Sequence, residues 1–183
     1  MEPARPCATG FEKEDTGEEI GMSDFPAKIL VATDGSEDSA LALQAAVNLS
    51  NDTGSELHLV HIGESHPVYP PPASGPPPST PSNEEVHRLA QEVLDAQSEH
   101  IGEMGGKVEE AHLRMGRPAE EILRLSEDIV AGLIVVGNQG LSGRFSRMRR
   151  FIMGSVSENV TRYARCSVMV VRKDLYDRPS TEG

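Results

Sequence analysis

Two short glycine-marked segments in the last third of the chain carry residues that could bind a phosphate. Gly137 and Gly140 follow directly after an apolar run, and Gly154 and Ser155 open a later amphipathic segment. Glycine lets a ligand approach the backbone closely, and a helix start offers unpaired N–H groups together with a partial positive charge. A buried strand, a glycine loop and a helix start in this order predict an anion site.

Five short apolar runs must supply the strands that position this site. Several are rich in Val, Ile and Leu, which is typical of a parallel sheet buried on both faces. The expected strands cover residues 28–33, 56–62, 107–114, 133–137 and 167–172.

Amphipathic segments with recognisable starts lie between these runs. Ser36 can cap the first helix, and Ser82 with Glu85 forms a capping box for the second. Pro118 suits the first position of the third helix, and the fourth is expected to begin at Ser155. This alternation predicts βαβ units with right-handed crossovers and a doubly wound α/β sheet.

The charge balance limits what such a domain could bind. The chain has 183 residues, enough for one domain with tails, and a formal net charge of −12. That charge disfavours general nucleic-acid binding, which needs Lys and Arg to neutralise phosphates, and docking on anionic membranes. No run approaches the ~18 apolar residues of a spanning helix, no signal-peptide pattern opens the chain, and the two cysteines make no disulfide framework. These features predict a cytoplasmic protein.

The packed domain is expected to cover 25–173. Two segments should lie outside it, and a third should lengthen a connection within it. Residues 1–24 carry seven acidic and two basic side chains with little apolar periodicity, which predicts a disordered acidic arm. A proline-rich loop at 64–82 holds eight of the thirteen prolines, which favours a surface loop over a partner ligand or a lid. Residues 174–183 predict a short frayed tail.

Three groups of residues, in this order and spacing, make the chain similar to the universal stress protein family over about residues 26–173. They are the opening strand with its aspartate at 29–36, the end of the second strand at 59–62, and residues 134–140 with 154–157 and 166–171. The resemblance implies a five-stranded parallel sheet in the order 3-2-1-4-5 with helices on both faces. This is a Rossmann-like arrangement, similar to that of the adenine nucleotide alpha hydrolases.

The ATP-binding branch of that family has two glycines three apart, nine further residues, and then Gly-Ser or Gly-Thr. This chain has the same residue types, but thirteen residues separate Gly140 from Gly154. Members without the glycine pattern generally bind no ATP, so the resemblance implies ATP, with Mg²⁺, as the ligand. The four extra residues, about one helical turn, leave open whether Gly154 still reaches the phosphates.

The resemblance also implies roles for single residues near the sugar and base. Ala32, Thr33 and Asp34 would line the floor beside the ribose, and the backbone of Ile62 would bond the adenine edge. These residues lie at the carboxyl ends of adjacent strands, where an open α/β sheet binds ligands. Asp34 could accept from a ribose hydroxyl or hold a water on Mg²⁺, and the alternative is a turn or helix-start aspartate.

The glycine segments would meet the phosphates. By resemblance, Gly137 and Gly140 would admit the ribose and the α-phosphate. The residues implied for the β- and γ-phosphates, through amides or hydroxyls, are Gly154, Ser155, Val156 and Ser157. Ser155 with Glu158 could instead form a capping box, which uses only one free N–H group and can coexist with a ligand.

Other polar side chains give weaker signals. Arg144, Arg147, Arg149 and Arg150 indicate either a solvated connector or a group that pairs with triphosphate or an acidic partner. His61, at a strand end, is expected to be packed or locally hydrogen-bonded. The remaining histidines have no partner at the spacing of a metal site or a nucleophile. The sequence predicts no metal held by the protein alone and no catalytic group.

The resulting expectation is a non-catalytic, ATP-binding stress protein that acts as a nucleotide-occupied sensor or adaptor for a protein partner. The resemblance implies a homodimer, often through the last strand, because an exposed sheet edge normally has to be covered. The alternatives are a protein–protein module without ATP and a binder of AMP or cAMP. A slow ATPase is less favoured, since no water-positioning base is evident.

Overall fold

The computed structural model describes residues 27–63, 82–140 and 153–173. The strands are β1 (Lys28–Thr33), β2 (Glu56–Gly63), β3 (Val108–Met115), β4 (Leu133–Gly137) and β5 (Ser167–Val171). The helices are α1 (Glu37–Thr53), α2 (Asn83–Glu103), α3 (Pro118–Asp128) and α4 (Ser155–Tyr163). The expected acidic arm, most of the proline-rich loop, the C-terminal tail, the arginine group and nearly all of the insertion after Gly140 lie outside the described residues.

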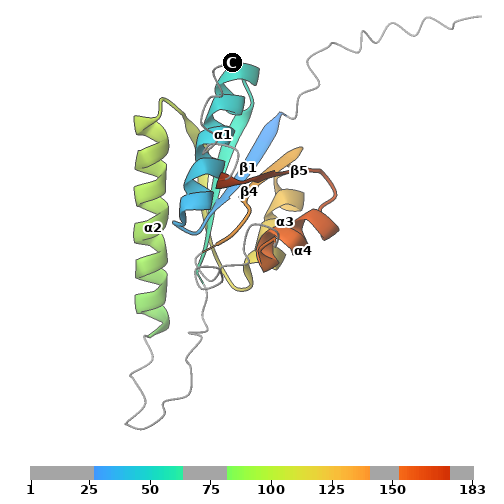
Figure 1. Ribbon diagram of the computed structural model, residues 1–183. Coiled ribbons are helices and arrows are strands. Elements are labelled where there is room, and N and C mark those ends of the chain that lie inside the picture. Colours follow the sequence, from blue (N-terminus) through green and yellow to red (C-terminus); the bar gives the residue numbers. More distant parts are fainter. Residues whose placement is uncertain (1–26, 64–81, 141–152, 174–183) are drawn as a thin grey trace, which may run out of the picture.

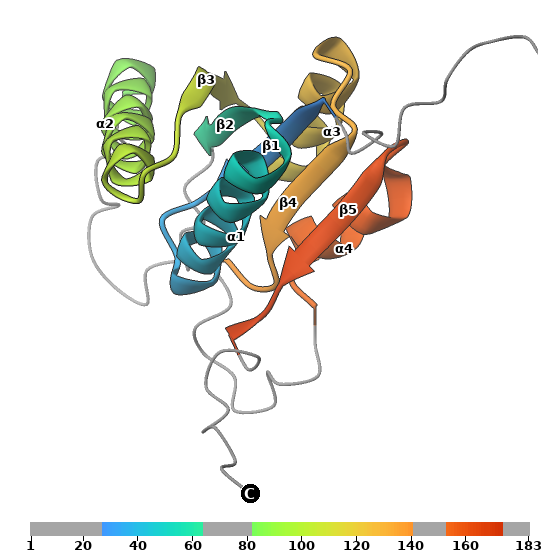
Figure 2. The same ribbon diagram turned by 90° about the horizontal axis from the view of Figure 1, so that it is seen from above.

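All strand pairs are parallel, and the sheet order is β3-β2-β1-β4-β5. Helices α1 and α2 cover one face of the sheet, and α3 and α4 cover the other (Figures 1 and 2). The predicted doubly wound fold and its strand order are therefore confirmed. Strand ends differ from the expected ones by a residue: β2 includes Gly63, β3 is shifted by one, and β5 ends at Val171.

Local chemistry explains where the helices begin. The hydroxyl oxygen of Ser36 accepts from the amide of Ser39 at 3.1 Å, and that of Ser82 accepts from the amide of Glu85 at 3.1 Å. Pro118 occupies the first turn of α3, where its missing N–H costs nothing. Each expected start is therefore present, although α4 is capped differently, as described below.

The core consists of two apolar layers, one on each side of the sheet. Alternate residues of β1 divide between them: Ile29 and Val31 pack with Leu43 of α1, whereas Leu30 packs with Ile122 of α3. All five side chains are at most 1% exposed. Each such burial contributes roughly 1.5–3 kcal/mol, which holds the strand ends in fixed places. None of the helices in the described ranges has the length and apolarity needed to cross a membrane.

Candidate functional site

The candidate site lies where β1 and β4, neighbours in the sheet, reach their carboxyl ends. From there β1 leads into α1 on one face, and the chain after β4 leads to α4 on the other face (Figure 2). Such a divergence between adjacent parallel strands is a topological switch point, the usual ligand site of an open α/β sheet. Asp34 follows β1, and Gly137 is the last residue of β4.

The start of α1 is fastened to the loop after β4. The hydroxyl of Ser36 donates to the carbonyl of Gln139 at 3.3 Å, and the amide of Gln139 donates to the Asp38 carboxylate at 3.0 Å. A Cβ on Gly137 would lie 2.7 Å from the carbonyl carbon of Asp38. Gly137 therefore permits the close approach of α1 to β4.

The side chain of Asp34 lies against Gly140, in the loop after β4. One carboxylate oxygen of Asp34 accepts from the amide of Ser36 at 3.0 Å, so the aspartate has the turn role considered above. A Cβ on Gly140 would overlap the other carboxylate oxygen of Asp34. The φ angle of Gly140 lies outside the left-handed region. The neighbouring carboxylate, rather than backbone strain, is what excludes a side chain at Gly140.

Helix α4 begins without a side-chain cap. Gly154 is the N-cap residue, with φ −67° and ψ 153°, and it has no side chain that could accept from the amides of the first turn. The alternative of a capping box from Ser155 and Glu158 is therefore wrong, because Ser155 is the first helical residue, where the helix was expected to begin. Within the part of the chain that the structure describes, no acceptor is bonded to the amides of Ser155, Val156 or Ser157. A helix start of this kind attracts an anion.

The thirteen-residue separation does not move this helix start away from the glycine loop. The amide of Gly154 donates to the carbonyl of Asn138 at 2.8 Å, and the Ser157 hydroxyl oxygen lies 3.0 Å from the same carbonyl oxygen. A Cβ on Gly154 would lie 2.9 Å from that oxygen. The hydroxyl of Ser157, which is 2% exposed, therefore bonds within the fold, and its amide is the group left for a ligand.

The residues expected beside the ribose and adenine occupy the ends of β1 and β2. The side chains of Ala32 and Ile62 pack against the layer under α3 and α4. Thr33 is buried, and its hydroxyl lies 3.3 Å from the side-chain oxygen of Gln97 in α2. Nδ1 of His61 lies 2.8 Å from the Thr33 carbonyl, which can only accept, so the ring nitrogen donates. The expected local hydrogen bond of His61 is confirmed.

Asn138 was not among the expected ligand-binding residues, although it lies between the two glycines. Its backbone amide donates to Val171 at 2.8 Å, and the residue is 9% exposed. Its side-chain oxygen is buried and has no hydrogen-bond partner among the described residues. An unpaired buried acceptor costs about 1–3 kcal/mol, so a ligand that donates to it would recover that energy. The sequence does not indicate this unpaired acceptor, because the direction of the Asn138 side-chain amide depends on the fold.

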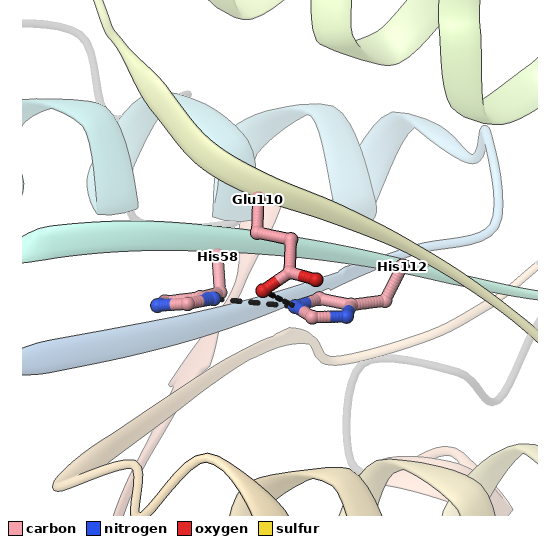
Figure 3. Close-up of side chains that lie close together, drawn as sticks. All are labelled: His58, Glu110 and His112. Carbon is pink, nitrogen blue, oxygen red and sulfur yellow. Dashed lines mark hydrogen bonds and ion pairs between the residues drawn. The ribbon is translucent and has the colours of Figure 1, made fainter.

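A second group of titratable side chains, His58, Glu110 and His112, gathers on β2 and β3, away from the strand ends (Figure 3). Nδ1 of His58 lies 3.2 Å from Nε2 of His112, and that nitrogen lies 3.8 Å from a carboxylate oxygen of Glu110. The expectation that the remaining histidines lack a partner at metal-ligand spacing is therefore wrong for this pair. The partners come from different strands, so their sequence separation hides them.

Comparison with known proteins places this fold among its relatives. A profile of the universal stress protein family matches residues 27–172. The universal stress protein YxiE of Bacillus subtilis is 35% identical over 150 residues, covering 79% of this chain and 98% of YxiE. A universal stress protein solved in complex with cAMP has a TM-score of 0.57 at 24% identity, covering 80% of this chain and 97% of that one.

A universal stress protein of Archaeoglobus fulgidus, solved in complex with dAMP, has a TM-score of 0.55 at 23% identity. This match covers 79% of the present chain and 96% of the other. The profile and the relative above 30% identity each extend over most of the chain, and the solved structures share its fold. The chain belongs to the universal stress protein family.

Proposed function

We propose that this protein binds an adenine nucleotide, ATP with Mg²⁺, in the crevice at the ends of β1 and β4. The observation that carries the proposal is the uncapped start of α4, held against the glycine loop by the bond from Gly154 to Asn138. Three amides there have no acceptor among the described residues, and the helix adds a partial positive charge. Together they suit the phosphate tail of a nucleotide.

The charge at Asp34 determines which part of the ligand lies beside Gly140. A phosphate directly against this carboxylate would be repelled. A ribose hydroxyl would instead donate to the carboxylate, and a water on Mg²⁺ would do the same. The proposed position of the sugar is therefore beside the contact between Asp34 and Gly140, with the phosphates directed toward α4.

The relatives with bound ligands support an adenine nucleotide as the ligand class. The two solved structures compared above contain cAMP and dAMP, each of which carries an adenine, a sugar and one phosphate. A monophosphate binder is accordingly the second candidate. ATP is preferred here because the three amides of the first turn of α4 can serve more than one phosphate group.

The function that follows is that of a cytoplasmic stress protein whose nucleotide occupancy is sensed by a protein partner, without dedicated catalysis. Bound nucleotide would stabilise the folded state by mass action, by about 2.7 kcal/mol at a hundred times Kd. The fraction of the protein that holds nucleotide would rise with the nucleotide concentration, and the partner would sense that fraction.

A homodimer through β5 completes the proposal. β5 pairs only with β4 among the described strands, which leaves its other edge open. Met169 on this strand is 37% exposed. Light scattering should give the mass of a dimer for the natural chain and of a monomer for Met169→Asp. An unchanged mass would place the interface elsewhere.

The nucleotide itself is tested by denaturing the purified protein and identifying what it releases. Calorimetric titration of the emptied chain with Mg-ATP, AMP and cAMP then ranks the ligands. Recovered ATP, or the tightest binding for Mg-ATP, would support the proposal. Preference for a monophosphate would establish the second candidate, and no binding of any of the three would refute both.

A further inference from the structure

The histidine pair on β2 and β3 forms a preorganised set of metal-ligating atoms. His58 and His112 lie with their rings nearly parallel, at an interplanar angle of 17°, and their facing nitrogens are 3.2 Å apart. Figure 3 shows the carboxylate of Glu110 beside the gap between these nitrogens. One ligand atom from each of the three residues lies within 4.8 Å of the others.

These distances match the coordination shell of zinc. Zinc binds histidine nitrogen at about 2.0–2.1 Å in tetrahedral geometry, which separates two such nitrogens by about 3.3 Å. The pair from His58 and His112 already has this separation, within a hydrogen bond between the two nitrogens whose proton the metal would replace. The Glu110 carboxylate lies 3.8 Å from the His112 nitrogen and within 4.8 Å of the His58 nitrogen, so it must move toward both. Its side chain is 64% exposed and therefore free to rotate.

The outer nitrogen of His58 lies near a carboxylate, as is common for metal-bound histidines. The His58 residue is only 3% exposed, and its Nε2 has no hydrogen-bond partner in the described part of the chain. A carboxylate oxygen of Glu56 lies 3.7 Å from this nitrogen. Metal-bound histidines commonly donate their other N–H to such a carboxylate, which fixes the tautomer. A metal on Nδ1 would place the proton on Nε2, facing Glu56.

The surroundings of His112 favour the neutral imidazole that a metal requires. Burial lowers the pKa of His112 below its ordinary value, against an opposing effect of Glu110, and His58 and Arg114 lower it further. The positive charge of Arg114 opposes a cation, but Asp128 pairs with it at 3.3 Å. The carboxylates of Glu56 and Glu110 supply the negative charge that a divalent cation needs.

We propose that His58, His112 and Glu110 bind one divalent transition-metal ion of the zinc class, with Glu56 orienting His58. Two imidazole nitrogens and one carboxylate oxygen suit zinc, and a water would complete the tetrahedron. The site is separate from the nucleotide crevice, because four residues of β2, or ~13 Å, separate His58 from Ile62. The tests of metal binding and of nucleotide binding are therefore independent, and either proposal can fail without the other.

The test titrates the full-length chain, freed of metal with a chelator, with Zn²⁺ in a calorimeter and with Co²⁺ in a spectrophotometer. The natural chain should bind one Zn²⁺ at this site and show the visible absorption of tetrahedral Co²⁺. Glu110→Gln should weaken Zn²⁺ binding by at least about tenfold, and Glu56→Gln by about 10- to 100-fold. His112→Asn should abolish the Co²⁺ absorption.

Two exposed side chains outside the proposed site provide matched controls. Glu109→Gln removes the adjacent carboxylate, which pairs with Lys107, and His100→Asn removes an imidazole from the exposed end of α2. Both should bind Zn²⁺ like the natural chain. If His112→Asn does not fold, Glu110→Gln decides the question, because that side chain is exposed. No Zn²⁺ binding by the natural chain, or equal affinity in Glu110→Gln, would overturn the proposal.

Discussion

Two glycines of the candidate site, Gly137 and Gly140, are expected to respond differently to the same small substitution. A methyl group on Gly137 would meet backbone atoms of α1, at 2.7 Å from the carbonyl carbon of Asp38 and 2.9 Å from the amide nitrogen of Ser39. A methyl group on Gly140 would meet only the end of the Asp34 side chain, which can rotate away. Gly137→Ala should therefore affect the fold, and Gly140→Ala should affect the ligand.

The magnitudes follow from these contacts. Forcing α1 away from β4 is a case of overpacking, which costs roughly 1–3 kcal/mol and should lower Tm by roughly 2–12 °C in a domain of this size. Gly140→Ala displaces the end of a side chain rather than backbone, and should lower the free energy of unfolding by at most about 1 kcal/mol through the Asp34 bond to the Ser36 amide. Displacing the Asp34 carboxylate removes a charged hydrogen bond to the ribose, worth about 1.5–3 kcal/mol. That loss corresponds to roughly 10- to 150-fold in Kd.

Two quantities are measured on the same preparations. Tm comes from thermal unfolding without nucleotide, and Kd comes from calorimetric titration with Mg-ATP. Natural affinity in Gly140→Ala would refute the placement of the ribose beside Asp34. An unchanged Tm in Gly137→Ala would refute the close packing of α1 on β4.

Three further predictions concern the scaffold. Ser82→Ala removes the cap of α2 and should lower the free energy of unfolding by about 1 kcal/mol; an unchanged urea midpoint would contradict this. Leu43→Ala, at a fully buried residue of α1, should cost about 2–5 kcal/mol in the same assay, and a loss well below 1 kcal/mol would show looser packing. Burial raises the pKa of the Cys166 thiol, so iodoacetamide should label it slowly near neutral pH until urea unfolds the chain. Rapid labelling of Cys166 in the folded protein, located by peptide mass mapping, would contradict the raised pKa of this partly buried thiol.

The strands and most helix starts could be predicted from the sequence because local signals agree with the fold. Ser36 and Ser82 are preferred cap residues, and both make the expected bonds. The start of α4 at Ser155 is also confirmed, but the alternative of a serine cap there is wrong for a tertiary reason. The carbonyl of Asn138 binds the amide of Gly154 at 2.8 Å, and the approach leaves no room for a Cβ. This contact makes the glycine, rather than the serine, the cap.

The histidine pair could not be predicted, because it depends on an irregularity in strand pairing. Leu57 pairs with Val108, but the register shifts at the next residue and places His58 opposite Glu110. Without that shift, Glu110 would face the other side of the sheet, since side chains alternate along a strand. Neither the composition of the two strands nor the spacing of their residues indicates a shift of one residue in their pairing.

The most direct test of nucleotide binding at the strand ends is an NMR titration of the labelled chain with Mg-ATP, observing backbone amides. The amide signals of Gly140, Ser155 and Val156 should shift together and saturate at one nucleotide per chain, while that of Val108 stays unchanged. Saturating shifts elsewhere, with the amides of α4 unmoved, would contradict the account.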